Sequence, residues 1–84
     1  MKLVFANEAQ DDYLCWQEQY RRRVERINTL IHETEREPFT GIGNPEPLKH
    51  ALAGVCSRRI NGEHRMVCKI KAGALLLAQL RFHS

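Results

Sequence analysis

The sequence has no hydrophobic run long enough to cross a membrane. Its longest apolar stretch extends from Ala72 to Leu80, well short of the roughly 20 residues that a spanning helix needs. A signal peptide is also disfavoured, because polar residues between Asn7 and Asp12 interrupt the short apolar run Leu3–Phe5 before a hydrophobic region is complete. We therefore expect a cytoplasmic protein with no membrane segment.

Cysteine is scarce as well. The three cysteines, Cys15, Cys56 and Cys68, are odd in number and share no metal-ligand or redox spacing. We expect reduced thiols that pack as small hydrophobic side chains. The sequence accordingly predicts neither a metal site nor a cofactor.

Acidic residues are rare in the second half of the chain. The 84 residues carry a formal net charge of +3 at pH 7, with an isoelectric point near 9.0. After Pro38 the acidic residues are Glu46 and Glu63, which basic residues heavily outnumber, whereas the first half mixes both signs. This distribution indicates an acidic partner. A chain this short buries about 60 to 65% of its unfolded surface, so we expect one domain, residues 1–84, with a thin core and a tendency to oligomerise.

The N-terminal half predicts a strand followed by two helices. Residues 2–5 form a strand candidate, and Asn7 is placed to cap a helix with Gln10 three residues later. An apolar stripe at helical spacing follows, made of Ala9, Tyr13, Trp16, Tyr20, Val24, Ile27 and Ile31. Because a single helix of this length would be unusual, we expect two, broken near Gln19 and ending near Arg36, shortly before a proline. The aromatic residues of this stripe are expected in the core rather than on a base-stacking surface.

After Pro38 the pattern changes to that of loops and strands. The segment Pro38–Pro47 is rich in glycine and proline and predicts a loop. A period of two then gives strand candidates at Gly54–Ile60, His64–Lys71 and Ala74–His83, joined by turns at Asn61–Gly62 and Ala72–Gly73. The predicted fold is α+β, with two N-terminal helices packed on one face of a four-stranded, mostly antiparallel sheet.

Alternation along the last strand predicts which residues meet the helices. Those directed toward the helices would be Ala78, Leu80 and Phe82, and those on the opposite face Gln79, Arg81 and His83. Arg59 and Arg65 flank the Asn61–Gly62 turn and are expected on that opposite face too. The face would be polar and open.

The second half of the chain contains the groups needed to cleave a phosphodiester without a metal. A base takes the proton of the attacking hydroxyl, fixed cations stabilise the pentacoordinate phosphate, and an acid protonates the leaving oxygen. The candidates are Glu46, Lys49, Arg58, Arg59, Glu63, His64, Arg65, Arg81 and His83. The chemistry predicted from the residues is that of a small ribonuclease.

Several motifs support this prediction by resemblance. They are Met-Lys-Leu at 1–3, Asp-Asp-Tyr-Leu at 11–14, Trp-Gln-Glu at 16–18, Pro-Glu-Pro-Leu-Lys-His at 45–50, Ser-Arg-Arg-Ile at 57–60 and Glu-His-Arg at 63–65. With them the chain resembles, essentially end to end, the YoeB toxins of the RelE superfamily, which are ribosome-dependent messenger RNA interferases of bacterial toxin–antitoxin pairs. The resemblance implies a RelE-like, microbial-ribonuclease-like fold.

The resemblance also implies roles for individual residues. Glu46 would be the general base on the RNA 2′-hydroxyl, Arg65 would stabilise the charged transition state, and His83 would be the general acid on the leaving 5′-oxygen. Lys49 and Arg59 would contact substrate phosphates. Accessory candidates are Glu63, Arg81 and Ser84. The implied partners are messenger RNA in the ribosomal A site, the ribosome, a YefM-like antitoxin, operator DNA through the antitoxin complex, and a second copy of the chain.

Ordinary structural roles remain open for the same residues. A loop glutamate such as Glu46 is usually solvated, Lys and Arg usually lie on the surface, and a histidine near a C-terminus is usually frayed. The family usually ends in His-Tyr, whereas this chain ends in His83-Ser84. Serine offers neither a stacking ring nor a phenol. A catalytically weakened RNA- or ribosome-binding homologue, acting mainly in a repressor complex with its antitoxin, is therefore the alternative.

Overall fold

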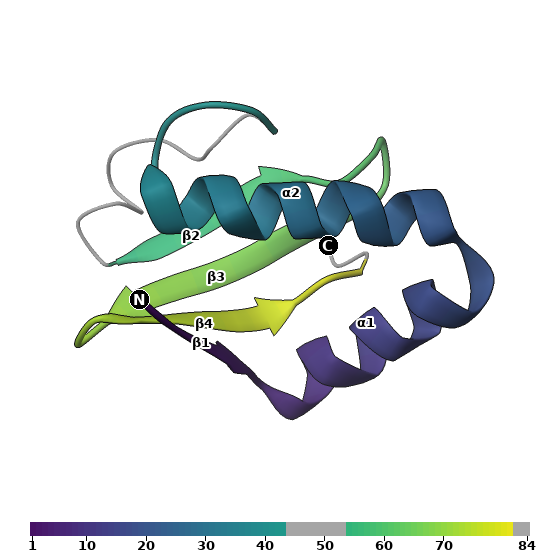
Figure 1. Cartoon of the computed structure of the whole chain (residues 1–84), viewed down its shortest axis with the longest axis horizontal. Coiled ribbons are helices and arrows are strands. Elements are labelled where there is room, and N and C mark those ends of the chain that lie inside the picture. The colour runs from purple at the N-terminus through teal and green to yellow at the C-terminus, as the bar shows by residue number, and fades with distance from the viewer. Residues whose placement is uncertain (44–53, 82–84) are drawn as a thin grey trace.

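The chain folds into two helices packed against a four-stranded mixed sheet. The structure is a computed structural model that describes residues 1–43 and 54–81. Its elements are β1 (Lys2–Phe5), α1 (Asn7–Gln19), α2 (Arg21–Arg36), β2 (Val55–Arg59), β3 (Arg65–Lys71) and β4 (Ala74–Gln79). The strand order is β1-β4-β3-β2, with β1 parallel to β4 and the other neighbours antiparallel. In Figure 1, α2 runs along the sheet in front of β2 and β3, while α1 packs beside β1 and β4. The predicted α+β fold is confirmed.

The helix break predicted near Gln19 occurs at Tyr20. This residue has extended backbone angles, φ −145° and ψ 91°, and serves as the cap of both helices. The predicted end near Arg36 is also confirmed. The predicted capping box is wrong, because Ala6 is the N-cap of α1, with no side-chain cap hydrogen bond, and Asn7 is already helical. Neither helix in the described part of the chain is long and apolar enough to cross a membrane.

The core lies between α2, α1 and one face of the sheet. Its buried apolar residues are Ala9, Trp16, Ile27, Leu30, Ile31, Cys56, Ile60, Met66, Cys68, Leu75, Leu77 and Leu80. Burying a leucine- or isoleucine-sized side chain contributes about 1.5–3 kcal/mol. Trp16 is anchored from α1, because its Nε1 donates to the Leu80 carbonyl at 2.7 Å. Tyr13 packs against this core, but the core prediction is wrong for Tyr20, which is 54% exposed at the helix break.

Two turns carry the chain through the β2–β3–β4 meander. Asn61 closes the first, since its Oδ1 accepts hydrogen bonds from the backbone N–H groups of Glu63 and His64. Ala72 and Gly73 form the second, with φ values of +50° and +74°. Two successive residues with positive φ match the twist of a tight hairpin. Both turns are where the sequence predicts them.

An irregularity near the end of β4 alters the predicted alternation. Cys68 pairs with Leu77, but Val67 pairs with Gln79, so Ala78 is an extra residue in the ladder. Leu80 is buried as predicted. Because of the bulge at Ala78, the side chains of β4 do not alternate regularly between the two faces from Ala78 to Leu80. The strand ends at Gln79 rather than continuing to His83; Phe82 and His83 lie outside the described residues.

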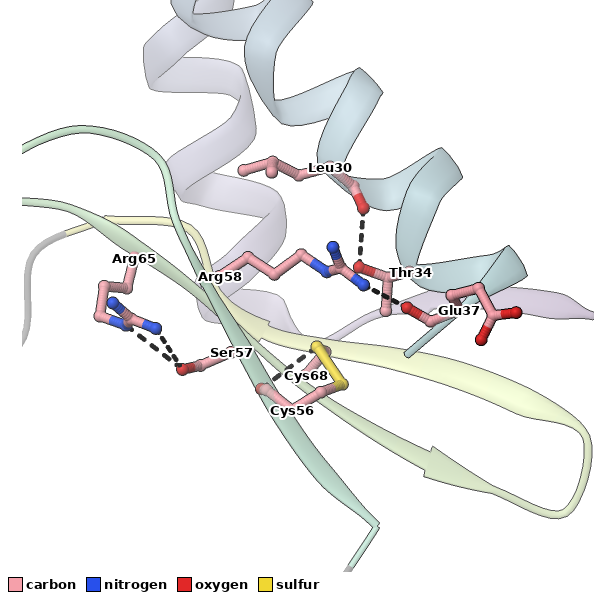
Figure 2. Close-up of a disulfide and its surroundings, with 8 residues drawn as sticks. All are labelled: Leu30, Thr34, Glu37, Cys56, Ser57, Arg58, Arg65 and Cys68. Atoms are coloured by element: carbon pink, nitrogen blue, oxygen red, sulfur yellow. Dashed lines mark hydrogen bonds between the residues drawn. A yellow bond between two sulfur atoms is a disulfide. The ribbon is translucent and has the colours of Figure 1, made fainter. Parts of the chain in front are cut away.

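The cysteine prediction is wrong for two of the three residues. Cys56 and Cys68 lie directly opposite one another on β2 and β3, with Cα atoms 5.0 Å apart, and they form a disulfide (Figure 2). The pairing depends on strand register, which their separation in sequence does not reveal. Their predicted burial is confirmed. Cys15 is a free, partly exposed thiol on α1.

Candidate functional site

Two arginines lie side by side on the face of the sheet that points away from the helices. Arg59 on β2 pairs directly with Arg65 on β3, which confirms that they share a side. We call this face, which also carries Ser57, the open face. Like charges placed directly opposite on neighbouring strands destabilise a sheet, in a range where such pairs are worth about 0.2–1 kcal/mol. Two neighbouring guanidinium groups can bind an anion such as phosphate.

Arg65 is oriented by a hydroxyl on the neighbouring strand. Its Nε and Nη2 donate to Ser57 Oγ at 3.2 and 2.9 Å (Figure 2). Ser57 is opposite Val67, two places along from Arg65, so this is a diagonal contact within one face. Because Ser57 is almost fully buried, the acceptor is fixed. One side of the guanidinium is thereby held in place.

The backbone of Arg59 is tied to both neighbouring segments. Its N–H donates to the Gly43 carbonyl at 2.6 Å, and its carbonyl accepts a hydrogen bond from Arg26 Nη2 of α2 at 3.1 Å. Gly43 has φ +82°, and a Cβ at this position would lie 3.0 Å from Arg58 Cβ. Glycine is therefore required for the chain to approach β2 so closely.

Arg58, the neighbour of Arg59, belongs to the core and not to the open face. It extends toward α2, on the opposite side of β2 from Ser57 and Arg65 (Figure 2), and is fully buried. Its guanidinium donates to the carbonyls of Glu37 and of Ile42, the latter at 2.8 Å. Burial lowers the pKa of Arg58 from its ordinary value, while the charge of Glu33 acts to raise it. Arg58 fixes residues 37–42 against the sheet, so its sequence-based place among the phosphate-cleaving groups is not supported.

Arg81 and His64 converge on Trp16 at the end of the sheet. The His64 ring meets the Trp16 ring edge-on, with centroids 4.9 Å apart. The guanidinium carbon of Arg81 lies 6.0 Å from the centroid of the Trp16 ring, and that of Arg23 lies 5.5 Å from it. Such contacts stabilise by about 0.5–1 kcal/mol at exposed sites. This cluster accounts structurally for Arg81, and no contact between described residues links Arg81 to the Arg59–Arg65 pair.

The other predicted site residues lie in the β2–β3 turn or outside the described residues. Glu63 lies exposed in the β2–β3 turn. Glu46, Lys49, His83 and Ser84 lie outside the described residues, so their proposed roles remain predictions from the sequence. The structure thus brings together Arg59 and Arg65 from the predicted set. In residues 1–43 and 54–81, no group of three or more His, Cys, Asp or Glu side chains is placed to hold a metal ion.

Comparison with known proteins identifies the family. Residues 5–84 match the family described as the YoeB-like toxin of bacterial type II toxin–antitoxin systems. The chain belongs to this family. Toxin YoeB of Escherichia coli K12 is 53% identical over 83 residues, which cover 99% of each chain.

Solved structures of YoeB-like toxins have the same fold. The YoeB/ParE toxin from Agrobacterium tumefaciens superposes with a TM-score of 0.88 at 49% identity, covering 100% of both chains. YoeB of Staphylococcus aureus, solved as a dimer, has a TM-score of 0.88 at 35% identity, covering 100% of this chain and 98% of the other. The same toxin in a heterotetrameric complex with YefM gives a TM-score of 0.84, with the same identity and coverage.

Sequence reasoning overlooked three residues on the open face of this YoeB-like chain. Ser57 was part of a quoted motif but received no role. Lys69 and Lys71 are exposed on β3, at the same strand parity as Arg65. The two lysines could have been recognised from the alternation in the segment Arg65–Lys71, where basic residues and buried apolar residues occupy opposite faces.

Proposed function

We propose that this YoeB-like toxin is a ribosome-dependent endoribonuclease that cleaves messenger RNA at the A-site codon and thereby stops translation. The observation that carries the proposal is the Arg59–Arg65 pair, with Arg65 oriented by Ser57. A fixed guanidinium fork matches two phosphate oxygens. Preorganised charge of this kind stabilises a transition state at little reorganisation cost.

The proposed reaction is attack of a 2′-hydroxyl on the adjacent 3′-phosphodiester. Glu46 takes the hydroxyl proton, the 2′-oxygen bonds to phosphorus, and the bond to the 5′-oxygen breaks. His83 gives a proton to that oxygen, so the products are a 2′,3′-cyclic phosphate and a 5′-hydroxyl. Arg65 stabilises the pentacoordinate phosphate, and Lys49 and Arg59 bind phosphate oxygens. The reaction requires RNA, because DNA has no 2′-hydroxyl, and we propose that it needs no metal ion.

The same proposal includes two protein partners. YoeB of S. aureus has been solved as a dimer and in complex with YefM. By analogy, we expect this toxin to form a homodimer and to be held inactive by a YefM-like antitoxin, with operator DNA bound through that complex. The toxin itself would act in the cytoplasm, where its messenger RNA substrate and the ribosome are found.

Cleavage mapping by primer extension on messenger RNA bound to purified ribosomes tests the proposed activity. We expect cuts within A-site codons that disappear in Glu46→Gln and Arg65→Ala. Arg22→Ala, an exposed arginine on α2, is the matched control and should cut normally. Intact messenger RNA with folded wild-type protein would refute the nuclease proposal.

Ser84 is the one observation that favours a second candidate function. Where the family usually ends in tyrosine, serine removes a ring able to stack on a base, and a catalytically weakened RNA- or ribosome-binding toxin would result. Ser84→Tyr discriminates between the two functions. Cleavage that appears only in Ser84→Tyr would support the weakened toxin, and equal cleavage by both proteins would reject it.

A further inference from the structure

Basic residues continue along β3 beyond Arg65. Lys69 and Lys71 are exposed, while Met66 and Cys68 between them and Arg65 are buried toward the helices. Residues at alternate positions of a strand share one face, so Arg65, Lys69 and Lys71 lie in one line on the open face. We call these three residues the basic track. At about 3.3–3.4 Å per strand residue, it spans about 20 Å from Arg65 to Lys71.

The usual structural explanation for lysines in a strand does not apply to Lys69. Lysine on an edge strand blocks pairing with other chains, but Lys69 pairs with β2 on one side and with β4 on the other. Lysine is also among the residues depleted in strands, and exposed lysines form no part of the core. Lys69 thus provides no edge protection, and neither lysine belongs to the core.

No carboxylate in the sheet balances this charge. Lys69 is opposite Val55 on β2 and Leu76 on β4, and Lys71 is opposite Ala74. Strands β2, β3 and β4 contain no Asp or Glu at all. Lys2 of β1 adds a further positive charge in the same row, because it too pairs with Ala74. On the open face, Lys69 and Lys71 therefore lie opposite uncharged strand residues, and one uncharged position, Val67, separates them from Arg65.

We infer that Lys69 and Lys71 bind backbone phosphates of the messenger RNA strand beyond the phosphate cleaved at Arg65, so that the RNA runs along β3 toward the Ala72–Gly73 turn. The identity of the strand rests on the proposed function. A positively charged surface that follows the backbone is how proteins bind single-stranded nucleic acid without reading its sequence. Lysine suits this role because its ammonium is a mobile point charge that needs no fixed geometry.

The length of the basic track supports several separate phosphate contacts. Lys71 lies about 20 Å and Lys69 about 13 Å along the strand from Arg65, distances over which a single phosphate cannot be shared. Each additional contact should release counterions from the RNA. For single strands the slope of log K against log salt concentration is about −0.7 for each phosphate neutralised, which provides a count of contacts.

Binding to a single-stranded 2′-O-methyl RNA oligonucleotide, measured across a series of salt concentrations, tests the inference. This probe keeps every phosphate but cannot be cut by 2′-hydroxyl attack. Lys69→Gln and Lys71→Gln should each reduce the magnitude of the slope by about 0.7, and the double variant by about 1.4. The control Arg21→Gln/Arg22→Gln removes the same charge from exposed positions on α2 and should leave the slope unchanged.

Two further measurements separate the messenger from other partners. Affinity for ribosomes carrying no messenger RNA and affinity for a YefM-like antitoxin should be the same for the double lysine variant and the wild type. An unchanged salt slope with the oligonucleotide would overturn the inference. So would a loss of affinity confined to the empty ribosome or to the antitoxin.

The outcome is independent of whether the proposed nuclease activity exists. If the lysine variants reduce the slope but the wild-type protein cuts no messenger RNA, RNA binding by the basic track is supported and the nuclease activity is rejected. If the wild-type protein cuts at the A site but the lysine variants leave the slope unchanged, the nuclease activity is supported and RNA binding by the basic track is rejected. Because both lysines are exposed, their variants should melt at the wild-type temperature, which checks that folding is intact.

Discussion

Ser57 provides a sharp test of how Arg65 is prepared for catalysis. In Ser57→Ala the guanidinium loses the acceptor of two hydrogen bonds, at 3.2 and 2.9 Å. Hydrogen bonds to charged groups contribute about 1.5–3 kcal/mol, and water replaces part of this where Arg65 is partly exposed. We expect a net loss of about 1–2 kcal/mol of transition-state stabilisation, a five- to thirtyfold decrease in kcat. KM should change little, because the hydrogen bonds of Ser57 hold Arg65, whose proposed role is in the transition state.

A double-mutant cycle with Arg65 tests whether Ser57 acts through that residue. Removing one preorganised donor to a transition-state oxyanion typically costs about 100- to 1000-fold in kcat, and we expect Arg65→Ala to fall in this range. Ser57→Ala should add nothing to Arg65→Ala, whereas Ser57→Thr should recover part of the activity by restoring a hydroxyl. Cleavage rates are measured on programmed ribosomes, and melting temperatures exclude unfolding. An undiminished effect of Ser57→Ala in the Arg65→Ala background would refute the reasoning.

Three predictions concern the stability of the scaffold. Arg58→Ala should lower the free energy of unfolding by about 3 kcal/mol or more, because it empties a large buried site and leaves the Glu37 and Ile42 carbonyls without their donor; a urea midpoint equal to that of wild type would contradict this. Gly43→Ala should cost about 1–3 kcal/mol, since φ is +82° and the new methyl would crowd Arg58, whereas Gly62→Ala, with nothing within 4 Å, is its control in the same assay. Reducing the Cys56–Cys68 disulfide should destabilise the protein by about 3 kcal/mol, as expected for cysteines separated by 12 positions in the sequence, and a melting temperature insensitive to reductant would show that the bond contributes nothing.

Local signals in the sequence predicted most of the fold. Helical spacing, the proline after Arg36 and the two turn dipeptides each act over a few residues, and the corresponding elements occur in the structure. Three features depended on tertiary register instead. The β-bulge at Ala78, the Cys56–Cys68 bond and the cap of α1 at Ala6 arise from which strands and helices meet. The spacing of residues along the chain does not predict any of these three features.

The orientation of the candidate site was predicted only in part. The sequence placed Arg59 and Arg65 on one open face, but it also counted Arg58 among the phosphate-cleaving groups, and the alternation of β2 sends Arg58 to the opposite face. Burial of Arg58 became evident only from its contacts with the segment after α2. The role of Ser57 likewise depends on its diagonal position relative to Arg65, which requires the strand register.

The burial of Cys56 and Arg58 on one face of β2 leaves the strand intolerant of any shift in pairing. A slip by one residue would exchange the faces of every side chain on the strand. Arg59 would then enter the space under α2, and Arg58 would emerge into solvent, abandoning the carbonyls of Glu37 and Ile42. Cys56 would leave the core at the same time and lose its place opposite Cys68. Because a disulfide needs its two Cβ atoms to point toward one another, the bond can form only in the register that directs Arg59 outward.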